Sequence, residues 1–364
     1  MPFDLPFDYV AGMALWLAGL ALGLRQLLKS RRRIKIQHPA RFNWANLGLS
    51  VWMFLAALTA VELYFATIYD QSDAFNATNV SRHWFARHVE PMQKVLQFRD
   101  GQATLYRDAR AFPTKLSAGQ HPICFIGDSF TFGHGVPNVA DRFSDRVGAA
   151  LERKAPGGFV VSNLADAGRE LHWGEALLEE LAADRLPVKT VIYVICLNDI
   201  ETFDDRTATL FEGKGSWVSG LFLLRHTYFL NLLYNRVRQA GSEKVGGYYA
   251  LLQDCYAGPA WERMRAKLDD IRRLCERNGM DLRIVVFPFL HDLGPDYSFG
   301  EAHRRITDYC REAGVPVLDL RRVLDPHVSE GLTVNRFDPH PNERAHALAA
   351  EAIEKDLLGD LTGE

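Results

Sequence analysis

Residues 123–136 read ICFIGDSFTFGHGV, an apolar run that leads directly into Gly127-Asp128-Ser129 and then into a turn rich in glycine. The segment Pro122–Ile126 has no polar break, which is typical of a strand buried on both faces, and Gly127 marks a sharp turn after it. We expect a helix to begin near Ser129, where backbone N–H groups can stabilise a developing oxyanion. The stretch therefore predicts a nucleophilic serine, provided that a base and further oxyanion donors follow downstream.

Strand and helix patterns alternate along the chain after Ser129. The expected strands are Phe159–Leu164, Thr190–Leu197, Leu282–Phe289 and Val315–Leu320, and the expected helices are His172–Asp184, Ala260–Asn278, Gly300–Ala313 and Glu343–Leu357. This alternation is typical of an α/β fold in which helices cover both faces of a parallel sheet. Sites in such folds lie at the carboxyl ends of the strands, where Ser129, Asn163–Gly168 and Asn198-Asp199 are all expected.

Four short blocks stand in a recognisable order: GDSFTFG, NLADAG ending in Gly168, CLND containing Asn198, and DPHPN containing His340. In this order they resemble the SGNH/GDSL hydrolases, and the resemblance extends from Pro122 to Leu357. It implies Ser129 as nucleophile, His340 as general base, and Gly168 N–H and the Asn198 side chain, with Ser129 itself, as the oxyanion hole. It also implies a flavodoxin-like three-layer α/β/α sandwich and ester hydrolysis or acyl transfer, with no cofactor and no metal.

The residue types agree with this chemistry. Acyl transfer needs a hydroxyl nucleophile, an imidazole whose pKa is near neutrality, and several donors directed at the oxyanion. Gly168 has no Cβ, so a substrate oxygen can approach its amide closely. Asn198 can donate a hydrogen bond without a charge that titrates.

The sequence Asp-Pro-His occurs twice, at residues 325–327 and at residues 338–340. Only the second copy is followed by Pro341-Asn342 and a helix pattern, so we predict His340 as the base and His327 as a surface residue.

The orienting acid departs from the family pattern. The family often places this acid three residues before the histidine, where this chain has Phe337, so Asp338 is the available carboxylate. Asp338 would hold the Nδ1 proton of His340. We expect Asp128 to bond backbone amides of neighbouring loops, and His134 to be a loop residue that lines the pocket.

The N-terminal region has a different character. Tyr9–Leu24 and Phe42–Val61 contain no charged residue, and together with its flanking residues each run approaches the ~20 residues that a helix needs to cross a bilayer. The loop expected between them is basic, with Lys29, Arg31, Arg32, Arg33, Lys35 and Arg41. By the positive-inside rule this loop is cytoplasmic and both chain ends lie outside.

We therefore expect an integral membrane protein with two spans, of the bacterial inner-membrane kind, whose catalytic domain is extracytoplasmic. A cleaved signal peptide is disfavoured because no basic residue precedes the first apolar run, and a buried core hairpin is the other alternative. Glu62, in the outer part of the second span, is expected to snorkel to the interface.

The predicted domains are a transmembrane hairpin (1–70), a linker and approach segment (71–120) and a catalytic domain (121–364) with an insertion at 200–259. The insertion is apolar around residues 217–234, but Arg225 and His226 argue against a third span. It could form a lid or acyl pocket, or a helix packed on the sheet. Among the five cysteines, Cys255, Cys275 and Cys310 could supply one disulfide.

The net charge of −3 and the absence of Lys and Arg interleaved with aromatic residues in the C-terminal three quarters exclude a nucleic-acid partner. The expected partners are the bilayer, an ester-bearing glycan or lipid, and other envelope-assembly proteins. Three functions are compatible with the residues: an esterase that removes O-acyl groups, acetyl above all, from an envelope glycan or lipid; an O-acyltransferase that uses the same serine; and a non-catalytic binding domain on this fold.

Overall fold

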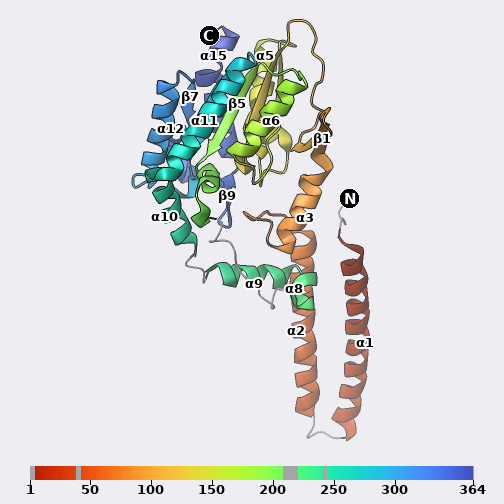
Figure 1. The fold of residues 1–364 in the computed structure, drawn as a ribbon. Coiled ribbons are helices and arrows are strands. Elements are labelled where there is room, and N and C mark those ends of the chain that lie inside the picture. Colours follow the sequence, from red (N-terminus) through yellow and green to blue (C-terminus); the bar gives the residue numbers. More distant parts are fainter. Residues whose placement is uncertain (1–4, 38–41, 208–219, 241–243, 364) are drawn as a thin grey trace. The chain divides into compact units, whose positions relative to one another are not determined.

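The structure is a computed structural model that describes residues 5–37, 42–207, 220–240 and 244–363 (Figure 1). The chain divides into two compact units. The helical unit comprises Met1–Arg87 and Lys214–Ser242, and the sheet unit comprises His88–Gly213 and Glu243–Glu364. The half of the predicted insertion around residues 220–240 therefore belongs to the helical unit.

The described part of the sheet unit is built on a five-stranded parallel sheet. Its strands are β3 (His121–Gly127), β4 (Phe159–Asn163), β5 (Thr190–Cys196), β6 (Asp281–Phe287) and β7 (Val317–Asp319), in the spatial order β4-β3-β5-β6-β7. Counted from β3, this is the order 2-1-3-4-5 of flavodoxin-like folds. Each strand lies where the sequence predicts it, within three residues, and the predicted fold class is confirmed. All seven residues of β5 are buried, as expected for a central strand covered on both faces.

Helices connect the strands and cover both faces of the sheet. They are α5 (Phe143–Lys154), α6 (Leu171–Ala183), α11 (Pro259–Arg277), α12 (Gly300–Glu312) and α14 (Glu343–Ala352), which a π-helical turn extends over Ile353–Leu357. The chain moves from β3 to β4 in one direction and from β4 to β7 in the other, so right-handed crossovers place α5 on the face opposite α6, α11 and α12. Accordingly α5 packs beside α14, and α6 packs beside α11 on the face seen in Figure 1.

The segment before the sheet is more ordered than the linker that the sequence predicts. It contains α3 (Asn79–His88) and an antiparallel hairpin of β1 (Gln93–Gln97) and β2 (Ala103–Arg107). The hairpin turns at Asp100-Gly101, a pair typical of tight turns, and Gly101 has a φ of +93°. Because the flanking runs are short and polar, their alternation is easily overlooked in the sequence.

The sheet unit also contains several short elements. These are α4 (Ser129–Phe132), α13 (Arg321–Leu324), α15 (Gly359–Thr362), the hairpin of β8 (Thr333–Asn335) and β9 (Asp338–Pro341), and 3-10 helices at Glu90–Met92, Val139–Asp141, Leu197–Phe203, Leu290–Asp292 and Asp325–Glu330. The longer helix α10 (Lys244–Ala257) belongs to the same unit. The five cysteines are buried free thiols.

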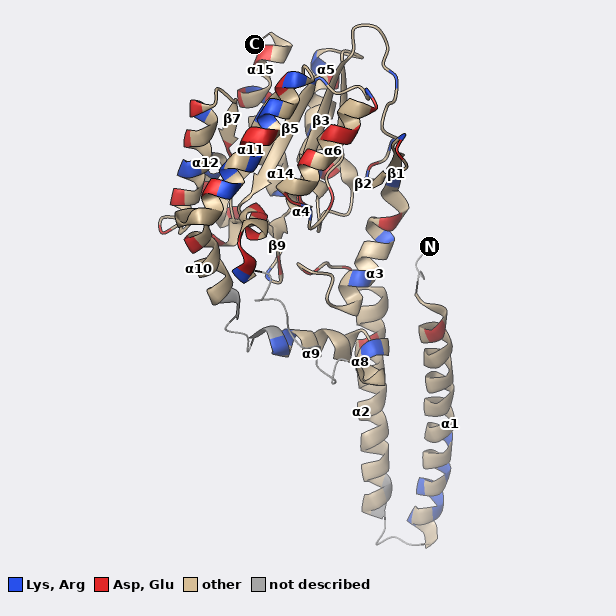
Figure 2. Ribbon diagram, viewed as in Figure 1, with Lys and Arg blue, Asp and Glu red and all other residues tan. Residues whose placement is uncertain are grey.

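The helical unit holds α1 (Phe7–Gln37), α2 (Phe42–Thr67), α8 (Phe222–His226) and α9 (Phe229–Ala240), together with most of α3. Both α1 and α2 are long and apolar enough to cross a membrane. The basic residues from Lys29 to Lys35, expected in a loop, lie in the last turns of α1 (Figure 2), because Lys and Arg are good helix formers. Arg41 lies outside the described residues.

Candidate active site

Ser129 is the first residue of α4, directly after β3. The Asp128 carboxylate caps this helix by accepting a hydrogen bond from the backbone N–H of Phe130 at 2.9 Å. A Cβ at Gly127 would lie 2.8 Å from the Val194 carbonyl oxygen on the neighbouring strand, so the tight turn accepts only glycine. The serine is half-buried, and its hydroxyl is held at the carboxyl edge of the sheet by rigid structure on both sides.

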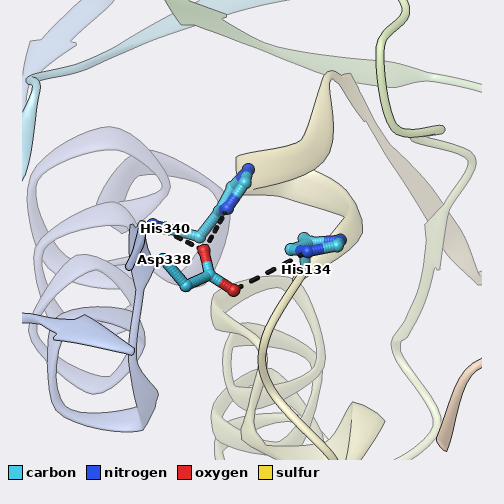
Figure 3. Close-up of side chains that lie close together, drawn as sticks. All are labelled: His134, Asp338 and His340. Atoms are coloured by element: carbon cyan, nitrogen blue, oxygen red, sulfur yellow. Dashed lines mark hydrogen bonds and ion pairs between the residues drawn. The ribbon is translucent and has the colours of Figure 1, made fainter. Parts of the chain in front are cut away.

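His340 lies on β9 and connects the serine to a carboxylate. Its Nε2 is 2.8 Å from Ser129 Oγ, and its Nδ1 is 2.5 Å from Asp338 Oδ1. The His340 backbone N–H also donates to Asp338 Oδ1, at 3.2 Å. Asp338 is fully buried, and its side chain turns toward the backbone N–H and the imidazole of His340, in the manner of an Asx turn (Figure 3). The structure thus joins Ser129, His340 and Asp338 in one hydrogen-bonded chain.

A second histidine approaches the same carboxylate. His134 Nε2 lies 3.7 Å from Asp338 Oδ2, the carboxylate oxygen that His340 does not use (Figure 3), and the centroids of the two imidazole rings are 4.5 Å apart. The His134 side chain is 3% exposed. The sequence predicts only a loop residue beside the pocket, because 204 positions separate His134 from Asp338 and nothing in the local pattern links them.

Arg107 fixes the backbone of the loop that carries His134. Its buried guanidinium donates hydrogen bonds to the carbonyl oxygens of Gly133 at 2.9 Å, Val136 at 2.8 Å and Pro137 at 2.9 Å. The β1–β2 hairpin, which ends at Arg107, therefore supports the site, a function that no local pattern in the sequence indicates.

Gly168 and Asn198 follow β4 and β5, the two strands that flank the serine's strand β3. Gly168 is exposed with a φ of +74°, a conformation that favours glycine, and among the described residues no atom beyond its two chain neighbours lies within 4 Å of the position of a Cβ. Asn198 is half-buried in the turn Leu197–Phe203. Both residues thus lie at the carboxyl edge of the sheet where the sequence predicts them, and their part in an oxyanion hole stays a prediction.

Two buried carboxylates lie below this edge. Burial raises the pKa of Asp128. Burial and the charge of Asp128 together raise the pKa of Asp199 well above its usual range, while its Oδ2 accepts a hydrogen bond from the Cys196 N–H at 3.3 Å. Each carboxylate accepts a backbone hydrogen bond, so these two groups support the turns that carry Ser129 and Asn198.

The first Asp-Pro-His copy lies away from this constellation. His327 Nδ1 pairs with Glu330 Oε1 at 2.6 Å on a partly exposed surface, and Asp325 pairs with Arg321 at 3.3 Å. The prediction that His327 is a surface residue is confirmed.

Among the described residues, His134, Asp338 and His340 are the group that could hold a metal ion, since one ligand atom from each lies within 4.8 Å of the others. His340 and Asp338 already use their facing atoms in a hydrogen bond of 2.5 Å. The geometry therefore suits proton transfer, with His340 between a hydroxyl and a carboxylate.

A serine, a histidine and a carboxylate joined in this order, at the carboxyl edge of a parallel sheet, form the arrangement that serine-type hydrolases use. The model of the GDSL-like lipase/acylhydrolase family matches residues 125–348. The chain therefore belongs to this family of ester-hydrolysing enzymes.

Several solved structures are similar to the chain. A two-domain esterase (CEX) active on acetylated mannans is 17% identical with a TM-score of 0.41, and the alignment covers 68% of this chain and 51% of that one. A catalytic mutant of Axe2, an acetylxylan esterase from Geobacillus stearothermophilus, is 14% identical with a TM-score of 0.41, and the alignment covers 67% of this chain and 96% of that one. A member of the lipolytic G-D-S-L family from Veillonella parvula is 15% identical with a TM-score of 0.40, and the alignment covers 65% of this chain and 97% of that one. The chain thus spans about half the length of the two-domain esterase. The comparison with curated proteins found no match to the chain.

Proposed function

We propose that this protein is a membrane-tethered serine esterase that removes O-acyl groups, acetyl above all, from a glycan or lipid of the cell envelope. The observation that carries the proposal is the hydrogen-bonded chain from Ser129 through His340 to Asp338. A non-catalytic binding domain has no need of a serine hydroxyl 2.8 Å from an imidazole that is itself oriented by a buried carboxylate.

In the proposed reaction Ser129 Oγ attacks the ester carbonyl carbon while His340 Nε2 takes the hydroxyl proton. Asp338 holds the Nδ1–H and stabilises the imidazolium. The tetrahedral oxyanion would receive hydrogen bonds from the Gly168 N–H, the Asn198 side chain and the N–H of Ser129 at the start of α4. Collapse of the tetrahedral intermediate expels the alcohol, which takes the proton from His340, and leaves an acyl-enzyme. A water molecule, deprotonated by His340, then attacks the acyl-enzyme, and a second collapse releases the acid and returns the proton to Ser129.

The proposed tether consists of α1 and α2. Five basic residues lie at the C-terminal end of α1 (Figure 2), whereas the acidic residue of its first turn is Asp8. The positive-inside rule then places the basic end in the cytoplasm and the sheet unit outside, at the inner membrane of a bacterial cell. In spheroplasts, added protease should cut the sheet unit without lysis, and protection until lysis would reverse this topology.

The activity is tested with the full-length protein in mild detergent. We expect release of p-nitrophenol and acetate from p-nitrophenyl acetate, and release of acetate from an acetylated glycan. The same assay is repeated with a glycan acceptor that carries no acyl group. Acyl groups appearing on the acceptor, with a matching loss of free acetate, would replace the esterase with the acyltransferase alternative. No turnover of any ester would contradict both.

A further inference from the structure

The half of the insertion that belongs to the helical unit is attached to the outer part of α2 through Glu62. The Glu62 carboxylate accepts hydrogen bonds from the backbone N–H groups of Tyr228 at 2.7 Å and Phe229 at 2.8 Å, and from the Tyr9 hydroxyl at 3.2 Å. These two amides begin α9, where unpaired N–H groups and the helix dipole favour a negative charge. Glu62 is 8% exposed, so the expectation that it snorkels to the interface is wrong.

Asn79, at the start of α3, holds the same segment from another side. Its side-chain amide donates to the carbonyl oxygens of Arg225 at 3.0 Å and Thr227 at 2.8 Å, and its backbone N–H donates to Asn231 Oδ1 at 2.9 Å. The turn between α8 and α9 is therefore fixed on α2 and α3, and α9 lies across α2 within the helical unit (Figure 1).

Two apolar faces result from this attachment. The inner face buries Tyr228 and Leu232 in a small core with Tyr9, Ala66 and Val80. The outer face of α9 repeats at i, i+3, i+4 and i+7, and it joins α8 to form an apolar groove of about 630 Å³. This outer face consists of Leu221, Phe222, Leu223, Leu224, Leu230, Leu233, Tyr234 and Val237.

The outer face is strongly exposed within the helical unit. Phe222 is 72% exposed, Val237 66% and Leu223 60%. A contiguous exposed patch of large apolar side chains marks an interaction surface rather than ordinary solvent-facing structure.

The outer face continues onto the flank of the two candidate spans. Phe222, Leu223 and Leu230, with His226 and Thr227, also line a second hollow, of about 480 Å³, whose other walls are the Asp8–Trp16 stretch of α1 and the Leu55–Glu62 stretch of α2. Whatever surrounds α1 and α2 at this level therefore also meets α8 and α9.

The depth of this level follows from helix geometry. At the basic end of the hairpin, Arg31 Nε bonds Asn46 Oδ1 at 3.1 Å. Glu62 lies sixteen residues further along α2, or ~24 Å at 1.5 Å per residue. In a hydrocarbon layer ~30 Å thick, that level is within ~6 Å of the opposite boundary, the depth at which amphipathic helices lie in the membrane plane.

We propose that α8 and α9 form an in-plane membrane segment whose outer face is immersed in the lipid at the outer boundary of the bilayer. The inference rests on the membrane insertion in the proposed function. In this proposal α8 and α9 are a second membrane attachment, because the chain leaves the sheet unit, places these two helices in the bilayer surface and then returns to the sheet unit. A lipid occupant is favoured over a protein because the patch is continuous with helices that are themselves suited to lipid.

Spin labels at single introduced cysteines test the proposal in proteoliposomes of the full-length protein. The five native cysteines are buried, so we expect them to react little with the spin label. The unsubstituted protein measures this background of labelling. The variants are Phe222→Cys and Val237→Cys on the outer face, and Arg238→Cys, exposed at the flank of the same helix, as the matched control. The measured quantity is the ratio of the relaxation of the label by oxygen to its relaxation by a water-soluble nickel chelate. We expect this ratio to be several-fold higher at Phe222 and Val237 than at Arg238.

A label at Phe54→Cys, in the middle of α2 where the side chain is 63% exposed, separates the two claims. If Phe54 is accessible to nickel, the hairpin does not cross the bilayer, and the tether in the proposed function fails with this inference. If Phe54 is in lipid but Phe222 and Val237 are accessible to nickel, this inference alone is overturned. Dipolar broadening between labels at Phe222 on different molecules would assign the face to a second copy and also overturn it.

Discussion

One oxygen of the Asp338 carboxylate accepts both the backbone N–H and the imidazole Nδ1–H of His340, although only Pro339 separates the two residues. The ring of Pro339 fixes its φ, which helps to hold the turn that folds the carboxylate back onto the histidine. An acid two positions before the histidine therefore reaches the imidazole directly.

If this carboxylate orients His340, Asp338→Asn should lower kcat by a large factor, up to roughly 10⁴, because an amide enforces the wrong imidazole tautomer. KM should be nearly unchanged. Steady-state hydrolysis of an aryl ester measures both. The matched control is Asp325→Asn at the other Asp-Pro-His, which should behave like the parent. A loss below about tenfold, roughly 1.4 kcal/mol, would point instead to a Ser129–His340 dyad.

His134 should support the reaction through Asp338. We expect His134→Phe, which keeps a ring against His340, to lower kcat about tenfold and to shift the acidic limb of the pH–rate profile, since the ring nitrogen 3.7 Å from Asp338 Oδ2 is removed. The thermal midpoint of the folded protein serves as the control for packing. An unchanged pH profile would reduce His134 to a packing residue.

The oxyanion hole should tolerate the loss of one donor better than the triad tolerates the loss of its nucleophile. Asn198→Ala should lower kcat by on the order of 10²–10³, or about 3–4 kcal/mol, and leave slow turnover that is still sensitive to Ser129. A variant with parental kcat would remove Asn198 from the proposed oxyanion hole.

His346 should make stability depend on pH. It is fully buried on α14 and its Nδ1 accepts the Phe143 N–H at 3.2 Å. Burial, with a contribution from the charge of Arg142, lowers its pKa to about 3 in the folded state. Its unfolded pKa is about 6.5, so below that pH the unfolded chain binds a proton that the folded chain does not, and stability falls as pH falls from about 6.5 toward 3.

His346→Gln keeps an acceptor for Phe143 but does not titrate. Between pH 6.5 and 5, the free energy of unfolding of the parent should fall by about 1 kcal/mol per pH unit more than that of the variant, because the other titrating groups are the same in both proteins. Urea unfolding in mild detergent across this range measures the difference. Equal slopes would mean that the folded protein accepts the proton on His346.

The strands of the sheet and the position of Ser129 could be predicted because they depend on local pattern, whereas the flavodoxin-like arrangement of the strands was implied by the family resemblance. Apolar runs such as Thr190–Cys196 and the glycine at 127 determine strand and turn with little help from distant residues. His340 could be distinguished from His327 for the same reason, since a proline, a capping asparagine and a helix follow only the former.

The remaining features depend on contacts between residues far apart in the chain. His134 reaches Asp338 because Arg107, on a hairpin expected to be part of a linker, holds the carbonyl groups of its loop. Glu62 is buried because two amides 166 and 167 positions away need an acceptor. Neither the contact of His134 with Asp338 nor that of Glu62 with the two amides produces a periodic or short-range pattern in the sequence.

The central claim is that Ser129 is the nucleophile, and covalent labelling tests it most directly. The full-length protein is treated with a fluorophosphonate, digested, and the modified residue located by mass spectrometry, with Ser129→Ala and His340→Ala treated in parallel. We predict one phosphonylated residue, Ser129, in the parent, none in Ser129→Ala, and greatly slowed labelling in His340→Ala. Labelling at another residue, or esterase activity in Ser129→Ala equal to that of the parent, would contradict the account.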